Sequence, residues 1–159
     1  MVAVVLFRSR LLVSLVGEIT FRKLEKRKMQ FFGEFKNLSE AAPSDTLGAE
    51  GLLDTQEFRN PVCGDRISVG VSFCDGKLNA LRYRSQGCWP VNGCLELLSR
   101  KYLGQSHQQI LEYRLEDFLA EVDEVPTSKR HAFSLAHRGV SAVVMKAWVL
   151  EKAGLKSGV

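Results

Sequence analysis

The sequence lacks the dense cysteines, the long apolar runs and the internal repeats that define several classes of protein. Its 159 residues contain four cysteines, too few and too widely spaced for a disulfide-stapled miniprotein, so free thiols in a reducing, cytoplasmic compartment are expected. No apolar run reaches the roughly 18 residues that span a bilayer, because Arg8 and Arg10 interrupt the apolar start of the chain. No internal repeat is present. With 45% hydrophobic and 25% charged residues, one globular domain is expected.

An excess of positive charge is also missing from most of the chain. Residues 1–28 hold seven Lys and Arg residues against two Glu residues, a net charge of +5. Since the whole chain carries +4, residues 29–159 have a net charge of −1. A nearly neutral body argues against nucleic acid as a partner, and the lack of a long apolar run argues against a membrane.

Residues 1–28 are apolar and then basic, with no turn residues that link them to the rest of the chain. They are interpreted as an upstream extension of a reading frame that starts at Met29, or as a leader peptide, with organelle targeting left open. A structured helix is the third alternative. The fold itself is expected to be a single domain over residues 29–159.

Hydrophobic periodicity predicts strands in the first half of this domain. Phe31, Phe32 and Phe35 are expected on one face of a short helix, and residues 37–54 are expected to form a loop. Residues 66–74 alternate with a period of two, as in a half-buried strand. An Asp-Gly pair occupies positions 75 and 76, and residues 77–85 form the return strand of a hairpin.

Helices are predicted in the second half. Pro90 suits the first turn of a helix that ends at Gly104, and Ser106 with Gln109 forms a capping box for a helix that continues towards residue 119. Ser128 is expected to cap a final helix with an apolar face over residues 132–148, closed at residue 154. Strands followed by helices predict an α+β fold, in which helices pack on one face of a small antiparallel sheet.

Three short motifs carry candidate metal ligands. Cys63 and Asp65 flank Gly64 in a turn, although a buried Cys and a capping Asp would give the same pattern. Cys88 lies between a strand end and a helix start, where unpaired N–H groups lower a thiol pKa, although it could also be a core residue. His131 begins the last helix and is either a ligand or a solvated side chain. Together, the four side chains have the types and number of a tetrahedral zinc or iron site.

The order of these motifs resembles the NifU/IscU/SufU iron–sulfur cluster assembly scaffolds over about residues 58–148. The likeness rests on Asn-Pro-Val-Cys-Gly-Asp at 60–65, the hairpin, Gln-Gly-Cys at 86–88, Gly104, and a Lys-x-His motif at 129–131. It implies a NifU N-terminal-domain-like fold of about three strands. It also implies cluster binding by Cys63, Asp65 and Cys88, with Gly64, Gly87 and Lys129 in support.

The sequence departs from this family at the third cysteine, where Ala132 comes after His131. His131 is therefore expected to complete the site. Trp89 and Pro90 replace the small residues that usually come after the second cysteine. The segment read by a dedicated Hsp70-type chaperone in the Isc branch appears only as Val-Pro-Thr-Ser-Lys at 125–129, which argues against that partner.

The resemblance implies a scaffold rather than an enzyme. It would take sulfur from a cysteine desulfurase, build a labile cluster, and pass the cluster to apo iron–sulfur proteins. The expected cluster type is [2Fe–2S]. One alternative is a degenerate paralogue that holds a single Zn²⁺ or Fe²⁺ ion or acts as an interaction module of the assembly machinery. The other is a sulfur-transfer enzyme with Cys88 as nucleophile and His131 as base. Cys94 is expected in the core and Cys74 is expected to be structural.

Overall fold

The computed structural model describes residues 27–47 and 55–155. The expectations for residues 1–26 lie outside these residues. A three-stranded antiparallel sheet in the order β2-β3-β4 forms the base of the fold, from β2 (Gln56–Arg59), β3 (Arg66–Cys74) and β4 (Lys77–Gln86). Asp75 and Gly76 have φ values of 50° and 72°, the left-handed conformations that a two-residue hairpin turn requires. The predicted hairpin is confirmed, and its second strand is one residue longer than expected.

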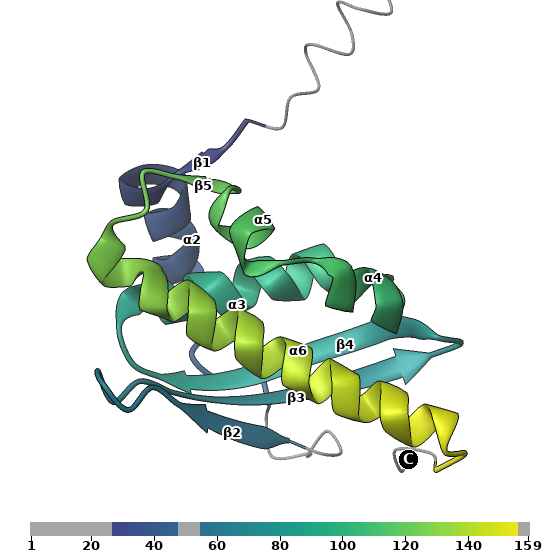
Figure 1. Cartoon of the computed structure of the whole chain (residues 1–159). Helices are drawn as coiled ribbons and strands as arrows, with labels where there is room; N and C mark the ends of the chain where they lie inside the picture. Colours follow the sequence, from purple (N-terminus) through teal and green to yellow (C-terminus); the bar gives the residue numbers. More distant parts are fainter. Residues whose placement is uncertain (1–26, 48–54, 156–159) are drawn as a thin grey trace, which may run out of the picture.

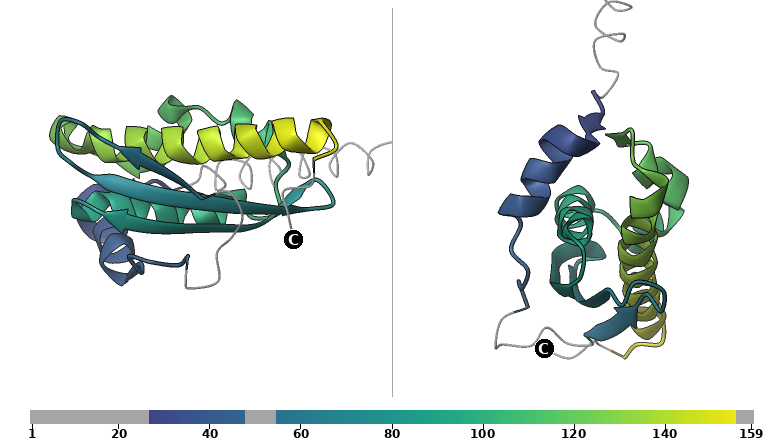
Figure 2. Two further views of the ribbon diagram at one scale, coloured as in Figure 1. Left: turned by 90° about the horizontal axis from the view of Figure 1, so that it is seen from below. Right: turned by 90° about the vertical axis from the view of Figure 1, so that its left-hand side faces the viewer.

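One face of the sheet carries the core, and the helices cover only that face (Figure 1 and Figure 2). The strand register pairs Val69 with Tyr83 and Val71 with Leu81, so the buried side chains of β3 and β4 share one side. Helices α3 (Trp89–Tyr102) and α6 (Arg130–Lys152) pack on this side and against each other. The α+β prediction, with about three strands and helices on one face, is confirmed.

The ends of α3 and α6 agree with the sequence signals in part. Cys88 is the N-cap of α3, Pro90 lies in its first turn, and Gly104 takes a φ of 77° just after it. Gly154 takes a φ of 70° after α6, as expected. The prediction that Ser128 caps α6 is wrong, because a 3₁₀ turn at Thr127–Lys129 precedes the helix and makes Lys129 the N-cap residue.

The helix predicted from Ser106 towards residue 119 is two helices, α4 (His107–Glu112) and α5 (Leu115–Leu119). The capping box of Ser106 and Gln109 is present at the start of α4. Arg114 is extended, with a ψ of 161°, and its backbone N–H donates to the Asp117 carboxylate. The chain therefore breaks at Arg114 and starts again, since this carboxylate caps the second helix.

The start of the described chain is more helical than its composition indicated. A π-helical turn at Phe31–Phe35 continues into α2 (Lys36–Ala41), where a loop was predicted. Phe31 and Phe35 are buried, whereas Phe32 is 71% exposed, so only two of the three rings face the core. The reason is that both buried rings stack into an aromatic cluster with Trp89 and Phe133, and this packing outweighs the weak local signal.

Two short backbone contacts attach this N-terminal region to the rest of the fold. β1 (Met29–Gln30) pairs in parallel with β5 (Val122–Asp123). Further along the chain, the Thr46 N–H donates to the Tyr83 carbonyl over 2.7 Å, so residues 44–46 run along the outer edge of β4. Within 27–47 and 55–155, no helix has both the length and the hydropathy that crossing a bilayer requires.

Candidate metal centre

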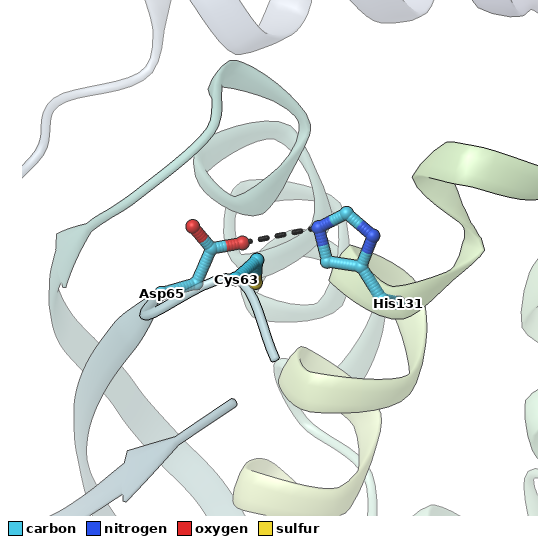
Figure 3. Close-up of side chains that lie close together, drawn as sticks. All are labelled: Cys63, Asp65 and His131. Carbon is cyan, nitrogen blue, oxygen red and sulfur yellow. Dashed lines mark hydrogen bonds and ion pairs between the residues drawn. The ribbon is translucent and has the colours of Figure 1, made fainter. Parts of the chain in front are cut away.

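The predicted ligands lie together at one end of the sheet, as Figure 3 shows for Cys63, Asp65 and His131. Asp65 immediately precedes β3, Cys88 lies two residues beyond the end of β4, and His131 is the second residue of α6. Because Arg66 pairs with Gln86, this is the open end of the hairpin and not its turn. The centre therefore lies at the opposite end of β3 and β4 from the Asp75–Gly76 turn.

Asp65 is the hub of the centre. Its side chain is buried, with 5% of the residue exposed. The backbone N–H of Cys88 donates to Oδ1 over 3.0 Å, and the Cys88 thiol donates to Oδ2 over 3.2 Å. The His131 Nε2 lies 3.1 Å from the same Oδ2 and 3.4 Å from the Cys88 sulfur. One carboxylate thus joins the start of α3 to the start of α6.

Cys63 reaches this hub through a tight turn. The Gly64 N–H donates to the Asn60 carbonyl over 2.9 Å, and the Asn60 N–H donates to the Asp65 carbonyl over 2.8 Å. Gly64 has a φ of 76°, which a side chain would disfavour. The ligand atoms of Cys63, Asp65 and His131 consequently lie within 4.8 Å of one another. Cys63 is exposed, so this side of the centre faces solvent.

Gly87 makes room for the carboxylate. A Cβ at this position would lie 2.6 Å from Oδ1 and 2.7 Å from Cγ of Asp65, well inside van der Waals contact. Its φ is outside the left-handed region, so the glycine is needed for space and not for its backbone conformation.

Burial and hydrogen bonding set the protonation of the ligands. Burial raises the pKa of Asp65, but hydrogen bonds from both thiols and the Cys88 N–H outweigh it and hold the pKa below its ordinary value. Burial, together with the adjacent Asp65 carboxylate, raises the pKa of Cys88 to about 12. The same causes raise the pKa of Cys63. The prediction that the helix start lowers the Cys88 pKa is therefore wrong, because burial and the adjacent carboxylate outweigh any effect of the helix start.

The remaining sequence candidates occupy distinct environments. Ala132, at the position of the family's third cysteine, is fully buried in the first turn of α6, directly after His131. Trp89 packs against the Phe31 ring, with centroids 5.0 Å apart. Cys94 is fully buried, as expected, and Cys74 is exposed at the opposite end of β3. The sequence did not indicate the role of the Cys88 backbone N–H, which carries no residue-type signal.

The donor set has a definite chemistry. Two thiols, one carboxylate and one imidazole are the ligand types that zinc and iron accept in tetrahedral sites. They come from three segments: the loop before β3, the start of α3 and the start of α6. The arrangement can hold a metal at the protein surface.

Comparison with known proteins identifies the class of fold to which this centre belongs. Residues 27–149 match the family described as the NifU-like N terminal domain, and the chain belongs to this family. The resemblance found in the sequence is therefore confirmed. Membership supports a role in iron–sulfur cluster assembly. A search of curated proteins found no match.

Solved structures show the same fold. The N-terminal part of a nitrogen-fixing NifU-like protein from Brucella abortus has a TM-score of 0.59 at 11% identity, covering 75% of this chain and 95% of that one. A putative iron–sulfur cluster assembly scaffold protein for the SUF system from Fervidobacterium islandicum AW-1 has a TM-score of 0.53 at 13% identity, covering 70% and 95%. A hypothetical protein has a TM-score of 0.57 at 18% identity, covering 72% and 96%.

Proposed function

We propose that this protein is a scaffold on which a labile iron–sulfur cluster is assembled and then passed to apo-proteins. The observation that carries the proposal is the convergence of Cys63, Asp65, Cys88 and His131 at the open end of the sheet. Family membership supports the same role. The cluster is the cargo of the protein, which binds it temporarily and then releases it to an acceptor.

The donor set favours release. Thiolates bind iron strongly because sulfur is a soft, electron-rich ligand, whereas carboxylate and imidazole are harder donors. With Ala132 in place of a third thiol, two of the four ligands are oxygen and nitrogen. A cluster held in this way is expected to be shorter-lived than one held by three thiolates. Sulfur would come from a cysteine desulfurase and would become bridging sulfide only after reduction.

A single metal ion is the second candidate, and the compactness of the site favours it. Donor atoms around one tetrahedral Zn²⁺ or Fe²⁺ lie about 2.0–2.3 Å from the metal and therefore about 3.3–3.8 Å from each other. The Cys88 sulfur and the His131 Nε2 lie 3.2 Å and 3.1 Å from Asp65, close to this separation, and the ligand atom of Cys63 lies within 4.8 Å of those of Asp65 and His131, so a small inward movement would complete the site. A binuclear cluster would require the ligands to spread apart.

The third alternative, a thiol enzyme, has less support. Cys88 and His131 are close enough to act as a nucleophile and base, at 3.4 Å. The neighbouring Asp65 carboxylate, however, accepts the thiol hydrogen bond and holds the thiol in its protonated form. This works against a thiolate nucleophile. We accordingly assign a non-enzymatic role, in a reducing compartment such as the cytoplasm.

Anaerobic reconstitution with iron and sulfide tests these three functions together, with visible absorption and metal analysis as the measurements. Visible charge-transfer bands indicate a scaffold, one tightly held zinc or iron ion indicates a mononuclear site, and the absence of metal refutes both. Cys63→Ser or Cys88→Ser should abolish stoichiometric binding, because each removes a thiolate.

Cys94→Ala is the matched control. Cys94 is fully buried on α3, so its truncation should lower the free energy of unfolding by about 1–2 kcal/mol and leave metal binding intact. If Cys94→Ala removed the metal while His131→Ala did not, the assignment of the fourth ligand would be wrong.

A further inference from the structure

The face of the sheet turned away from the helices is lined with arginine. The side chains of Arg66 on β3 and of Arg82 and Arg84 on β4 point outward, because their positions alternate with the buried ones. On β2, Arg59 pairs in register with Arg66 and shares its side. We call these four side chains the arginine face.

Only half of this positive charge is neutralised. Arg59 pairs with Glu57 at 2.9 Å, and Arg84 pairs with Asp45 at 2.8 Å. Arg66 and Arg82 form no ion pair with any residue of 27–47 or 55–155. The arginine face thus keeps a net charge of +2, although residues 29–159 together carry −1. The charge is local to this face and is not a result of basic composition.

The arginine face borders the metal centre. Arg66 is the residue directly after Asp65, and its partner Gln86 directly precedes Gly87. A shallow pocket of about 190 Å³ lies at this end of the sheet, lined by Glu57, Arg66, Ile67, Ser68, Arg84 and Gln86. A molecule bound on the arginine face would therefore lie next to the metal ligands.

The side chains between the arginines indicate what kind of molecule fits. The face is flat between the arginines, because the residues there have small side chains: Ser68, Gly70, Ser72 and Ala80. None of the described residues on this face is aromatic, so bases have nothing to stack on, and none is a large apolar side chain that could enter a membrane.

Carboxylates match the face better than a phosphate backbone does. The guanidinium fork binds a carboxylate with paired hydrogen bonds. The ion pairs to Glu57 and Asp45 leave two unpaired guanidinium groups on this face, which suit a few carboxylates of a protein segment better than a phosphate backbone, since binding of a phosphate backbone depends on many cationic contacts. We propose that the arginine face is the docking surface for an acidic, Asp- and Glu-rich segment of a partner protein that works at the metal centre.

The test measures binding of a fluorescein-labelled oligoglutamate by anisotropy at about 50 and 200 mM salt. Wild type should bind, more weakly at the higher salt. Arg66→Glu combined with Arg82→Glu should weaken binding about tenfold, since each change replaces attraction by repulsion. Arg66→Ser with Arg82→Ser provides a milder variant of the same pair. Lys152→Glu, an exposed substitution at the end of α6, is the control for Arg66→Glu alone, because each changes the net charge by −2, and Lys152→Glu should bind as wild type does.

Three results would overturn the proposal: no binding of oligoglutamate to wild type, equal loss in the Lys152→Glu control, or tighter binding of a charge-matched oligothymidylate. The last would assign the face to nucleic acid. Metal content of each variant is measured in parallel, so a failure at the arginine face is distinguished from a failure of the metal centre.

Discussion

Substitution of Gly87 by alanine tests the central geometric claim, that the Asp65 carboxylate organises the metal centre. The added Cβ would lie 2.6 Å from Oδ1, 2.7 Å from Cγ and 2.9 Å from Cβ of Asp65. All three atoms belong to one short, buried side chain, so the clash cannot be relieved by the swing of a flexible end. Asp65 must move, and its contacts with Cys88 and His131 must lengthen.

These contacts set the size of the effect. Overpacking of this kind lowers the free energy of unfolding by about 1–3 kcal/mol. Loss of the groups that orient metal ligands typically weakens metal binding by about 10–100-fold. Because the backbone of Gly87 is outside the left-handed region, alanine adds no strain of its own. Any loss of affinity is therefore attributable to the displaced carboxylate.

The assay is competitive titration of Zn²⁺ against a chromophoric chelator, together with urea denaturation of the metal-free protein. Gly104→Ala is the control, since Gly104 has a φ of 77°, with no atom within 4 Å of the added Cβ, and lies outside the centre. It should lower stability through backbone strain but leave the zinc affinity unchanged. Equal zinc affinity in wild type and Gly87→Ala would refute the role given to Asp65.

Three further predictions concern other parts of the chain. Ala132→Cys should slow the loss of a reconstituted cluster to a chelator, because a thiolate replaces a harder donor. Since position 132 is fully buried, the larger side chain should also lower the free energy of unfolding by about 1–3 kcal/mol. An unchanged rate of cluster loss would mean that the new sulfur does not reach the metal. Burial lowers the pKa of His107 below its ordinary value of 6.5, and the charge of Glu151 opposes this shift only in part. As the pH falls, the unfolded chain therefore takes up the proton before the folded chain does. The free energy of unfolding should consequently decrease below about pH 6.5. His107→Phe, which keeps the ring stacking on Phe73, should give a shallower fall in urea denaturation between about pH 7.5 and 5.5; a parallel fall would refute this linkage. A chain that starts at Met29 should melt at the wild-type temperature and bind the same metal, as measured by calorimetry, because the Arg27–Glu34 ion pair it loses is exposed; a large drop would show that the upstream residues pack on the fold.

The elements that sequence patterns predicted well are those held by local rules. The alternation over residues 66–74, the Asp75–Gly76 turn and the helical spacing after Pro90 all depend on backbone geometry over a few residues. The patterns failed at Arg114 and at Phe32. There, a cap or a contact with a distant ring decided the outcome, and a local pattern contains no information on either.

The same distinction between local and long-range information applies to the metal centre. The sequence by itself gives the residue types of the proposed ligands and their order along the chain, since these depend only on residue identity. The absence of a thiol at Ala132 became evident only through the resemblance to the family. Only the tertiary structure placed Asp65 between Cys88 and His131, which lie 23 and 66 positions away along the chain. It also decided that the Cys88 thiol is held protonated, and that the arginines on β3 and β4 form one exposed face. Protonation and surface charge depend on which groups are neighbours in space, and for segments this far apart only folding sets those neighbours.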